Sequence, residues 1–178
     1  FEPALRERVA LLAGLPSTSL QDVHDDVTLM PGAATLLATL KQNNVFCGLV
    51  SGGFSFFADK IAAQLNFDAC HCNQLEIEAG HLTGKVIDPI LGREAKAARL
   101  QSWCDEKNQP TAETLAVGDG SNDLDMLKLS GMGVAFRAKP LVADATDFRI
   151  VHGDLTALLY LQGYQACLLY TSPSPRDK

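Results

Sequence analysis

The chain has 178 residues, of which 47% are apolar, and it carries a formal net charge of −6 at pH 7. That length supports one sizeable core, and an acidic chain without a basic patch argues against a nucleic-acid or membrane-surface partner. No apolar run reaches the roughly 20 residues that span a bilayer, so we expect a cytoplasmic globular protein that acts on a small molecule.

The predicted elements begin with two helices within residues 1–27, where apolar residues recur at helical spacing. A proline and a glycine at 31–32 then open a third helix that runs to about Asn43. The nearly continuous apolar run 45–50 predicts a strand buried on both faces of a parallel sheet. Ser51-Gly52-Gly53 follows at the carboxyl end of that strand.

Strands and helices alternate through the rest of the chain, which is typical of a parallel sheet with helical crossovers. The predicted helices cover 54–65, 92–107, 124–129 and 155–161, and the predicted strands cover 68–72, 114–117, 133–136 and 148–151. One interruption, 73–77 and 81–86 around a Glu-Ala-Gly turn, indicates a β-hairpin. The fold class expected is therefore α/β, with a Rossmann-like parallel sheet and one hairpin.

The acidic stretch VGDGSND at 117–123 lies where a predicted strand turns into a helix. In open α/β sheets ligands bind at that edge, and Asp119 and Asp123 offer the hard oxygen atoms that Mg²⁺ prefers. The simpler interpretation is an acidic turn that only caps the helix through Ser121 or Asn122.

Two further groups have the chemistry to hold a phosphate. Ser51 and the glycines after it offer a hydroxyl and free backbone N–H groups, although the same residues could form an ordinary strand-to-helix turn. Lys96 lies in the first turn of a predicted helix and could neutralise a phosphate, pair with Asp123, or be solvated. All three groups map to one sheet edge, which predicts a pocket for a phosphoryl group held by magnesium, a hydroxyl and an ammonium.

The five cysteines are an odd number in scattered positions. Cys70-His71-Cys72 has no second pair of ligands that would complete a zinc site. We therefore interpret the cysteines as reduced and mostly buried thiols rather than as metal ligands.

Five motifs, in this order and spacing, resemble the phosphoserine phosphatases of the haloacid dehalogenase superfamily. They are LVSGGF at 49–54, NQLE at 73–76, AK at 95–96, VGDGSND at 117–123 and AKP at 138–140. The resemblance runs from Phe1 to about Ala166. It implies a haloacid dehalogenase-type core over 29–166 and the remnant of a small helical cap over 1–28. Residues 167–178 look like a translated sequencing adapter, so we interpret them as an artefactual tail.

In that family an aspartate in an Asp-x-Asp-x-(Thr/Val) motif attacks phosphorus, and a second aspartate acts as general acid and base. The 178 residues contain no such motif. The family carries it on a central strand upstream of the position that matches Phe1, between the strands 45–50 and 114–117. The resemblance therefore implies a fragment that lacks its central nucleophile strand and is itself inactive.

The resemblance also assigns roles to residues that are present. Ser51 would bond the phosphoryl oxygens, Lys96 would stabilise the phosphoryl charge, and Asp123 would orient Lys96. Asp119 would ligate Mg²⁺. The substrate-contacting residues that it implies are Phe1, Arg8, Gly52 and Asn122.

The reaction implied for the full-length parent is hydrolysis of O-phosphoserine to serine and phosphate, the last step of serine biosynthesis, through an aspartyl-phosphate. Two alternatives stay open. One is a related phosphatase or phosphotransferase for another small phosphate ester, such as phosphohomoserine. The other is a non-catalytic module that binds phosphate or Mg²⁺. No sequence feature predicts an oligomeric state.

Overall fold

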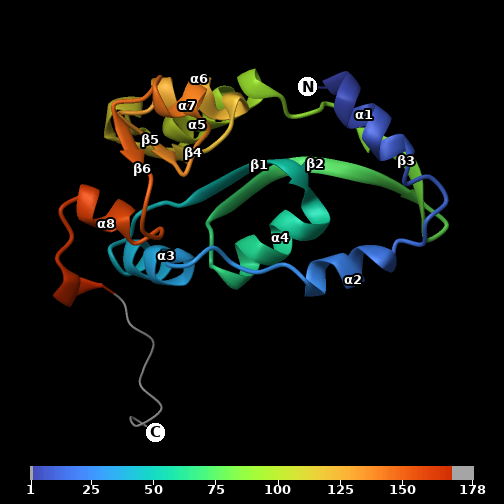
Figure 1. The fold of residues 1–178 in the computed structure, drawn as a ribbon, viewed down its shortest axis with the longest axis horizontal. Coiled ribbons are helices and arrows are strands. Elements are labelled where there is room, and N and C mark those ends of the chain that lie inside the picture. Colours follow the sequence, from blue (N-terminus) through green and yellow to red (C-terminus); the bar gives the residue numbers. More distant parts are fainter. Residues whose placement is uncertain (1, 170–178) are drawn as a thin grey trace, which may run out of the picture.

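The computed structural model describes residues 2–169, in which helices and strands alternate along the chain (Figure 1). The first half contains α1 (Glu2–Ala10), α2 (Ser19–Asp25), α3 (Ala33–Gln42), β1 (Gly48–Phe54), α4 (Ser55–Gln64), β2 (Ala69–Glu78) and β3 (His81–Ile87). The second half contains α5 (Arg93–Lys107), β4 (Leu115–Gly118), α6 (Leu124–Leu129), β5 (Met132–Phe136), α7 (Pro140–Ala143), β6 (Phe148–Ile150) and α8 (Ala157–Leu161). Short 3-10 turns cover Thr111–Glu113, Ser121–Asp123 and Ala166–Leu168. The predicted α/β class is confirmed.

The strands form two sheets of three strands each, in the orders β1-β2-β3 and β4-β5-β6. In the second sheet all pairs are parallel. In the first, β2 runs parallel to β1 over its first half and antiparallel to β3 over its second half. The strand expected at 68–72 and the hairpin strand expected at 73–77 are therefore one continuous strand. Within the described residues β1 and β4 are edge strands, each paired on one side only.

The core of the second sheet is packed on both faces. Val134 and Phe136 of β5 point to one cluster and Ala135 to another, as the period-two alternation of a strand requires. Helices α3 and α8 cover the first face, and α6 and α7 cover the second (Figure 1). The two clusters contain Leu36, Leu37, Cys47, Val134, Phe136, Ile150, Leu158 and Leu159, and Ala116, Leu124, Leu127, Ala135 and Val142, respectively.

Strand β1 differs from its prediction in both position and burial. It begins at Gly48, contains Ser51 and the two glycines that were expected to follow it, and has no fully buried residue. The reason is that β1 pairs only with β2, so its other edge stays open. The ring of Trp103 in α5 occupies the space that a side chain on Gly48 would need. The register also shifts between Ser51 and Phe54, where the strand turns into α4.

Helix α1 packs against β3, and the chain after it pairs with the same strand (Figure 1). The Gly14 N–H donates to the Leu82 carbonyl at 2.8 Å, and the Leu82 N–H donates to the Leu15 carbonyl at 2.9 Å. Gly84 has a φ of +81°, and Ala13 lies 2.8 Å from where its Cβ would be. The helical region expected to be a cap remnant is thus fixed to the hairpin. No helix within residues 2–169 is long and apolar enough to cross a membrane.

The cysteines are less buried than the sequence predicted. All five are free thiols, but only Cys47 and Cys104 are buried. Cys70 and Cys72 are half-buried on β2, and Cys167 is exposed. The alternation of β2 explains the difference, because residues two apart on a strand share one face and this face is covered by the single helix α4.

Candidate active site

The corner between β4 and α6 is organised by the carboxylate of Asp123. Its Oδ2 accepts the backbone N–H of Asp119 at 3.1 Å and that of Gly120 at 3.0 Å. A Cβ on Gly118 would lie 2.7 Å from this same oxygen, so only glycine leaves room for the folded-back side chain. The glycine and the acid therefore fix the loop conformation together.

The second oxygen of Asp123 binds Lys96, which reaches it from α5. The Lys96 Nζ donates to Oδ1 at 2.5 Å, and both side chains are buried. A buried ammonium needs a charged partner because its desolvation is costly. The pairing that the sequence suggested for these two residues is present, and it connects the start of α5 to the loop that carries Asp119.

Asp119 lies at the end of β4 and is exposed. Its backbone carbonyl accepts the N–H of Lys139 at 3.3 Å, while no donor or cation within residues 2–169 binds its carboxylate. A free carboxylate suits Mg²⁺, which typically takes one or two carboxylates and completes its shell with water and phosphate. The donor chemistry of this corner thus fits the metal that the sequence predicted.

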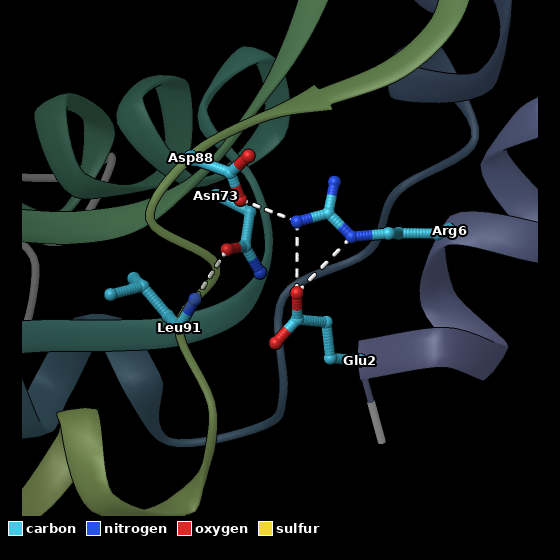
Figure 2. A network of polar contacts seen from close by, with 5 residues as sticks. All are labelled: Glu2, Arg6, Asn73, Asp88 and Leu91. Carbon is cyan, nitrogen blue, oxygen red and sulfur yellow. Dashed lines mark hydrogen bonds and ion pairs between the residues drawn. The ribbon is translucent and has the colours of Figure 1, made fainter.

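Ser51 and Gly52 are held from the other sheet. The Ser51 Oγ accepts the Gly53 N–H at 3.0 Å. The buried Asn73 donates from Nδ2 to the Gly52 carbonyl at 2.9 Å, and its Oδ1 accepts the Leu91 N–H at 2.7 Å (Figure 2). Leu91 lies two residues before α5. Asn73 thus links the strand end that carries Ser51 to the helix that carries Lys96.

No role was predicted for Asn73, although it lies in one of the motifs that carry the family resemblance. The helix α5 itself was predicted, but its place in space relative to the two sheets was not. This helix contacts β1, the Ser121–Asp123 turn and α6, so it lies between the Ser51 strand and the Asp119 corner. The structure thus joins Lys96, Asp123 and Asp119 directly, and Asn73 links Gly52 to the segment that leads into α5.

The remaining predicted residues are farther from this centre or outside it. The Asn122 side chain lies over Gly120, with its Cγ 3.6 Å from where a Cβ would be. Arg8 is exposed on α1. Phe1 lies outside the described residues. The arginine of α1 that binds a residue outside its own helix is Arg6, as described next.

Arg6 bridges α1 and the segment before α5. Its Nη2 donates to Glu2 Oε1 at 2.8 Å and to Asp88 Oδ1 at 2.5 Å (Figure 2). A cavity of about 490 Å³ lies at the start of α5 and is lined by Glu2, Ile90, Arg93 and Asp125 among others. Lys96, in the next turn of α5, is not among the residues that line this cavity.

Arg93 and Asp125 form a second link between α5 and α6, and both line that cavity. The guanidinium binds both carboxylate oxygens, from Nε at 2.6 Å and from Nη2 at 2.5 Å. This hydrogen bonding lowers the pKa of Asp125. No sequence signal predicts this pair, because its members are 32 positions apart.

Comparison with known proteins identifies the family. Residues 1–128 match the family model described as haloacid dehalogenase-like hydrolase. The chain belongs to the haloacid dehalogenase-like hydrolases. It is 44% identical over 163 residues to the phosphoserine phosphatase SerB2 of Mycobacterium tuberculosis, which covers 92% of this chain and 40% of that protein. It is also 44% identical over 159 residues to a phosphoserine phosphatase of Lactococcus lactis, covering 89% of this chain and 74% of that protein.

A solved structure of a substrate-bound phosphoserine phosphatase superposes on this haloacid dehalogenase-like chain with a TM-score of 0.87 and 35% identity. The superposition covers 90% of this chain and 77% of that one. The haloacid dehalogenase-type fold expected from the motifs is therefore confirmed. The chain spans well under half the length of the mycobacterial relative and about three quarters of the lactococcal one.

Proposed function

We propose that this chain supplies the phosphate-holding and metal-binding part of a phosphatase that hydrolyses O-phosphoserine to serine and phosphate. The observation that carries the proposal is the buried Lys96–Asp123 ion pair, whose acid also binds the backbone of Asp119, a residue with a free carboxylate. The names of relatives 44% identical to the chain support phosphoserine as the substrate. The five free thiols support a reducing, cytoplasmic location.

Each residue has a distinct task in the proposed reaction. The ammonium of Lys96 carries three N–H donors, so it can hold Asp123 with one and stabilise phosphoryl charge with another. The Ser51 hydroxyl binds phosphoryl oxygens, while Asn122 and Gly52 contact the substrate. Mg²⁺, held by Asp119, neutralises phosphoryl charge when bound. Arg8 and Phe1 belong to a cap that closes over the substrate.

The nucleophile must come from sequence outside these 178 residues, because they contain no Asp-x-Asp-x-(Thr/Val) motif. The open edges of β1 and β4 are the positions where a strand carrying that motif would pair. We therefore propose that the 178-residue chain alone is inactive.

The test restores the nucleophile. A segment that carries the family's Asp-x-Asp-x-(Thr/Val) motif is fused in front of Phe1, and phosphate release from O-phosphoserine is measured with Mg²⁺. We expect turnover by the fusion and none by the chain alone. Lys96→Ala and Asp119→Ala should each lower kcat by about 10²–10³, as removal of an oxyanion-stabilising group does. Asp105→Asn, at an exposed position near the end of α5, is the matched control.

Three outcomes would count against the proposal. Turnover by the chain alone that disappears in Asp119→Ala would show that no external nucleophile is needed. Faster hydrolysis of phosphohomoserine than of phosphoserine by the fusion would favour a related phosphatase. A folded fusion that binds Mg²⁺ but hydrolyses neither ester would favour a binding module.

A further inference from the structure

A cluster of three metal-ligating side chains, none of them assigned to the candidate active site, lies between β2 and α4. Cys70 and Cys72 share one face of β2, and their Sγ atoms are 4.0 Å apart. Asp59 of α4 approaches the same face, with Oδ1 3.9 Å from the Sγ of Cys72. The ligand atoms all lie within 4.8 Å of one another.

The residue between the two cysteines faces the opposite side of the sheet. His71 accepts a hydrogen bond at Nε2 from Arg99 of α5, at 3.1 Å. The sequence lacks a second pair of ligands that would complete a zinc site with Cys70 and Cys72. The side chain that joins the two thiols is instead the carboxylate of Asp59 on the neighbouring helix, and not the adjacent His71.

We propose that Cys70, Cys72 and Asp59 bind a thiophilic divalent cation, Zn²⁺ in the first place, with a water molecule as the fourth ligand. Tetrahedral zinc with bonds of about 2.3 Å to sulfur and about 2.1 Å to oxygen sets the sulfur atoms about 3.8 Å apart, and sulfur and oxygen about 3.6 Å apart. The observed 4.0 and 3.9 Å differ from these values by only a few tenths of an ångström.

The surroundings leave the carboxylate available to a cation. Asp59 is exposed, and no lysine, arginine or histidine within the described residues forms an ion pair with it. Zinc binding must release the protons of both thiols to solvent. Two sulfur ligands favour Zn²⁺ over Mg²⁺ or Ca²⁺.

The cluster shares no residue with the proposed magnesium site, although it lies next to the strand that carries Ser51. Asp119 belongs to the second sheet, whereas Cys72 is the register partner of Ser51 in the first. Bound zinc would tie α4 to β2, one strand away from the serine predicted to hold phosphate. The zinc proposal rests on this cluster alone and stands or falls independently of the phosphatase activity.

The first experiment measures zinc affinity of the purified, reduced 178-residue chain by competition with a chromophoric chelator. We expect one equivalent of Zn²⁺ per chain, and Co²⁺ in its place should give a thiolate charge-transfer band. Cys70→Ser and Cys72→Ser should each weaken binding by more than about 100-fold, since even groups behind the ligands change metal affinity by 10–100-fold. Asp59→Asn should also weaken binding, whereas Cys167→Ser, an exposed thiol outside the cluster, should not.

A second measurement needs no variant and so does not depend on whether the variants fold. Alkylation of the reduced wild-type chain is followed by mass spectrometry with and without Zn²⁺. Zinc should protect Cys70 and Cys72 while Cys167 reacts at the same rate in both samples. Equal alkylation of Cys70 and Cys72 with and without the metal, or zinc affinity unchanged in a folded Cys72→Ser chain, would overturn the proposal.

Discussion

Two ion pairs join α5 to the corner between β4 and α6, and they differ in their surroundings rather than in their length. Lys96–Asp123 and Arg93–Asp125 each have a shortest nitrogen–oxygen distance of 2.5 Å. The side chains of the first pair are 8% and 6% exposed, and those of the second are 48% and 36% exposed. Exposed pairs contribute little because solvent screens them, whereas breaking a buried pair leaves a charge without water or partner.

The pairs also differ in what else they hold. Asp123 uses its second oxygen to bind two backbone N–H groups of the loop that carries Asp119. Asp125 uses both oxygens for the guanidinium alone. The buried pair therefore couples helix packing to the shape of the candidate active site, and the exposed pair does not.

The largest effect is expected from Asp123→Ala. This change leaves Lys96 buried without a partner and removes the acceptor of two backbone N–H groups, so it should lower the free energy of unfolding by about 3–5 kcal/mol. Denaturant titration followed by circular dichroism measures the change. Asp125→Ala is the matched control and should leave the unfolding midpoint nearly unchanged. Similar losses of stability in the two variants would show that burial does not distinguish the two ion pairs.

The contrast between the two pairs also separates what the sequence can predict from what it cannot. The Asp119–Asp123 turn was predictable because its glycines, its acids and the helix after it are local signals. The burial of Lys96 was not, because the apolar periodicity of α5 is weak and burial depends on how that helix lies against the corner. The Asn73 bridge joins Gly52 and Leu91, 21 and 18 positions away, and has no periodic signature.

The errors in the prediction have a similar origin. A strand buried on both faces was expected at 45–50, but burial of β1 depends on whether a strand pairs with its open edge. The shared face of Cys70 and Cys72 follows from strand alternation, which the sequence contains. The approach of Asp59 does not, because it depends on how α4 packs on β2.

Gly118→Ala should have the next largest effect on the free energy of unfolding, because a side chain at this position would contact Asp123 of the buried pair. The new methyl group would meet the Asp123 carboxylate and displace it from Lys96. Overpacking of this kind costs about 1–3 kcal/mol. Gly92→Ala is the control, since no atom lies within 4 Å of its added Cβ and its φ is −90°. A Gly118→Ala chain as stable as the Gly92→Ala chain would mean that Asp123 can move without cost.

Double-mutant cycles should resolve the two pairs by their response to salt. For Lys96 and Asp123 we expect a coupling energy of about 1–3 kcal/mol, typical of residues in direct contact. This coupling should persist at about 1 M salt because the pair is shielded from mobile ions. For Arg93 and Asp125 any coupling at low salt should disappear at high salt. A buried-pair coupling that falls with salt as the exposed one does would show that solvent reaches Lys96.

The smallest effect concerns pH and the exposed pair. Hydrogen bonding to Arg93 lowers the pKa of Asp125 below its ordinary value of 3.8. A lowered pKa in the folded state means that the pair adds stability above pH 3.8 and loses it as the pH falls through the folded-state value. Arg93→Ala should therefore be slightly less stable than the wild type near neutral pH and equally stable in strong acid. NMR titration of the Asp125 carboxyl carbon should show its pKa rising towards 3.8 in Arg93→Ala. An unchanged Asp125 titration would mean that the guanidinium does not hold this carboxylate in solution. Arg93–Asp125 would then not be an ion pair in solution, whereas the evidence for the buried Lys96–Asp123 pair would be unaffected.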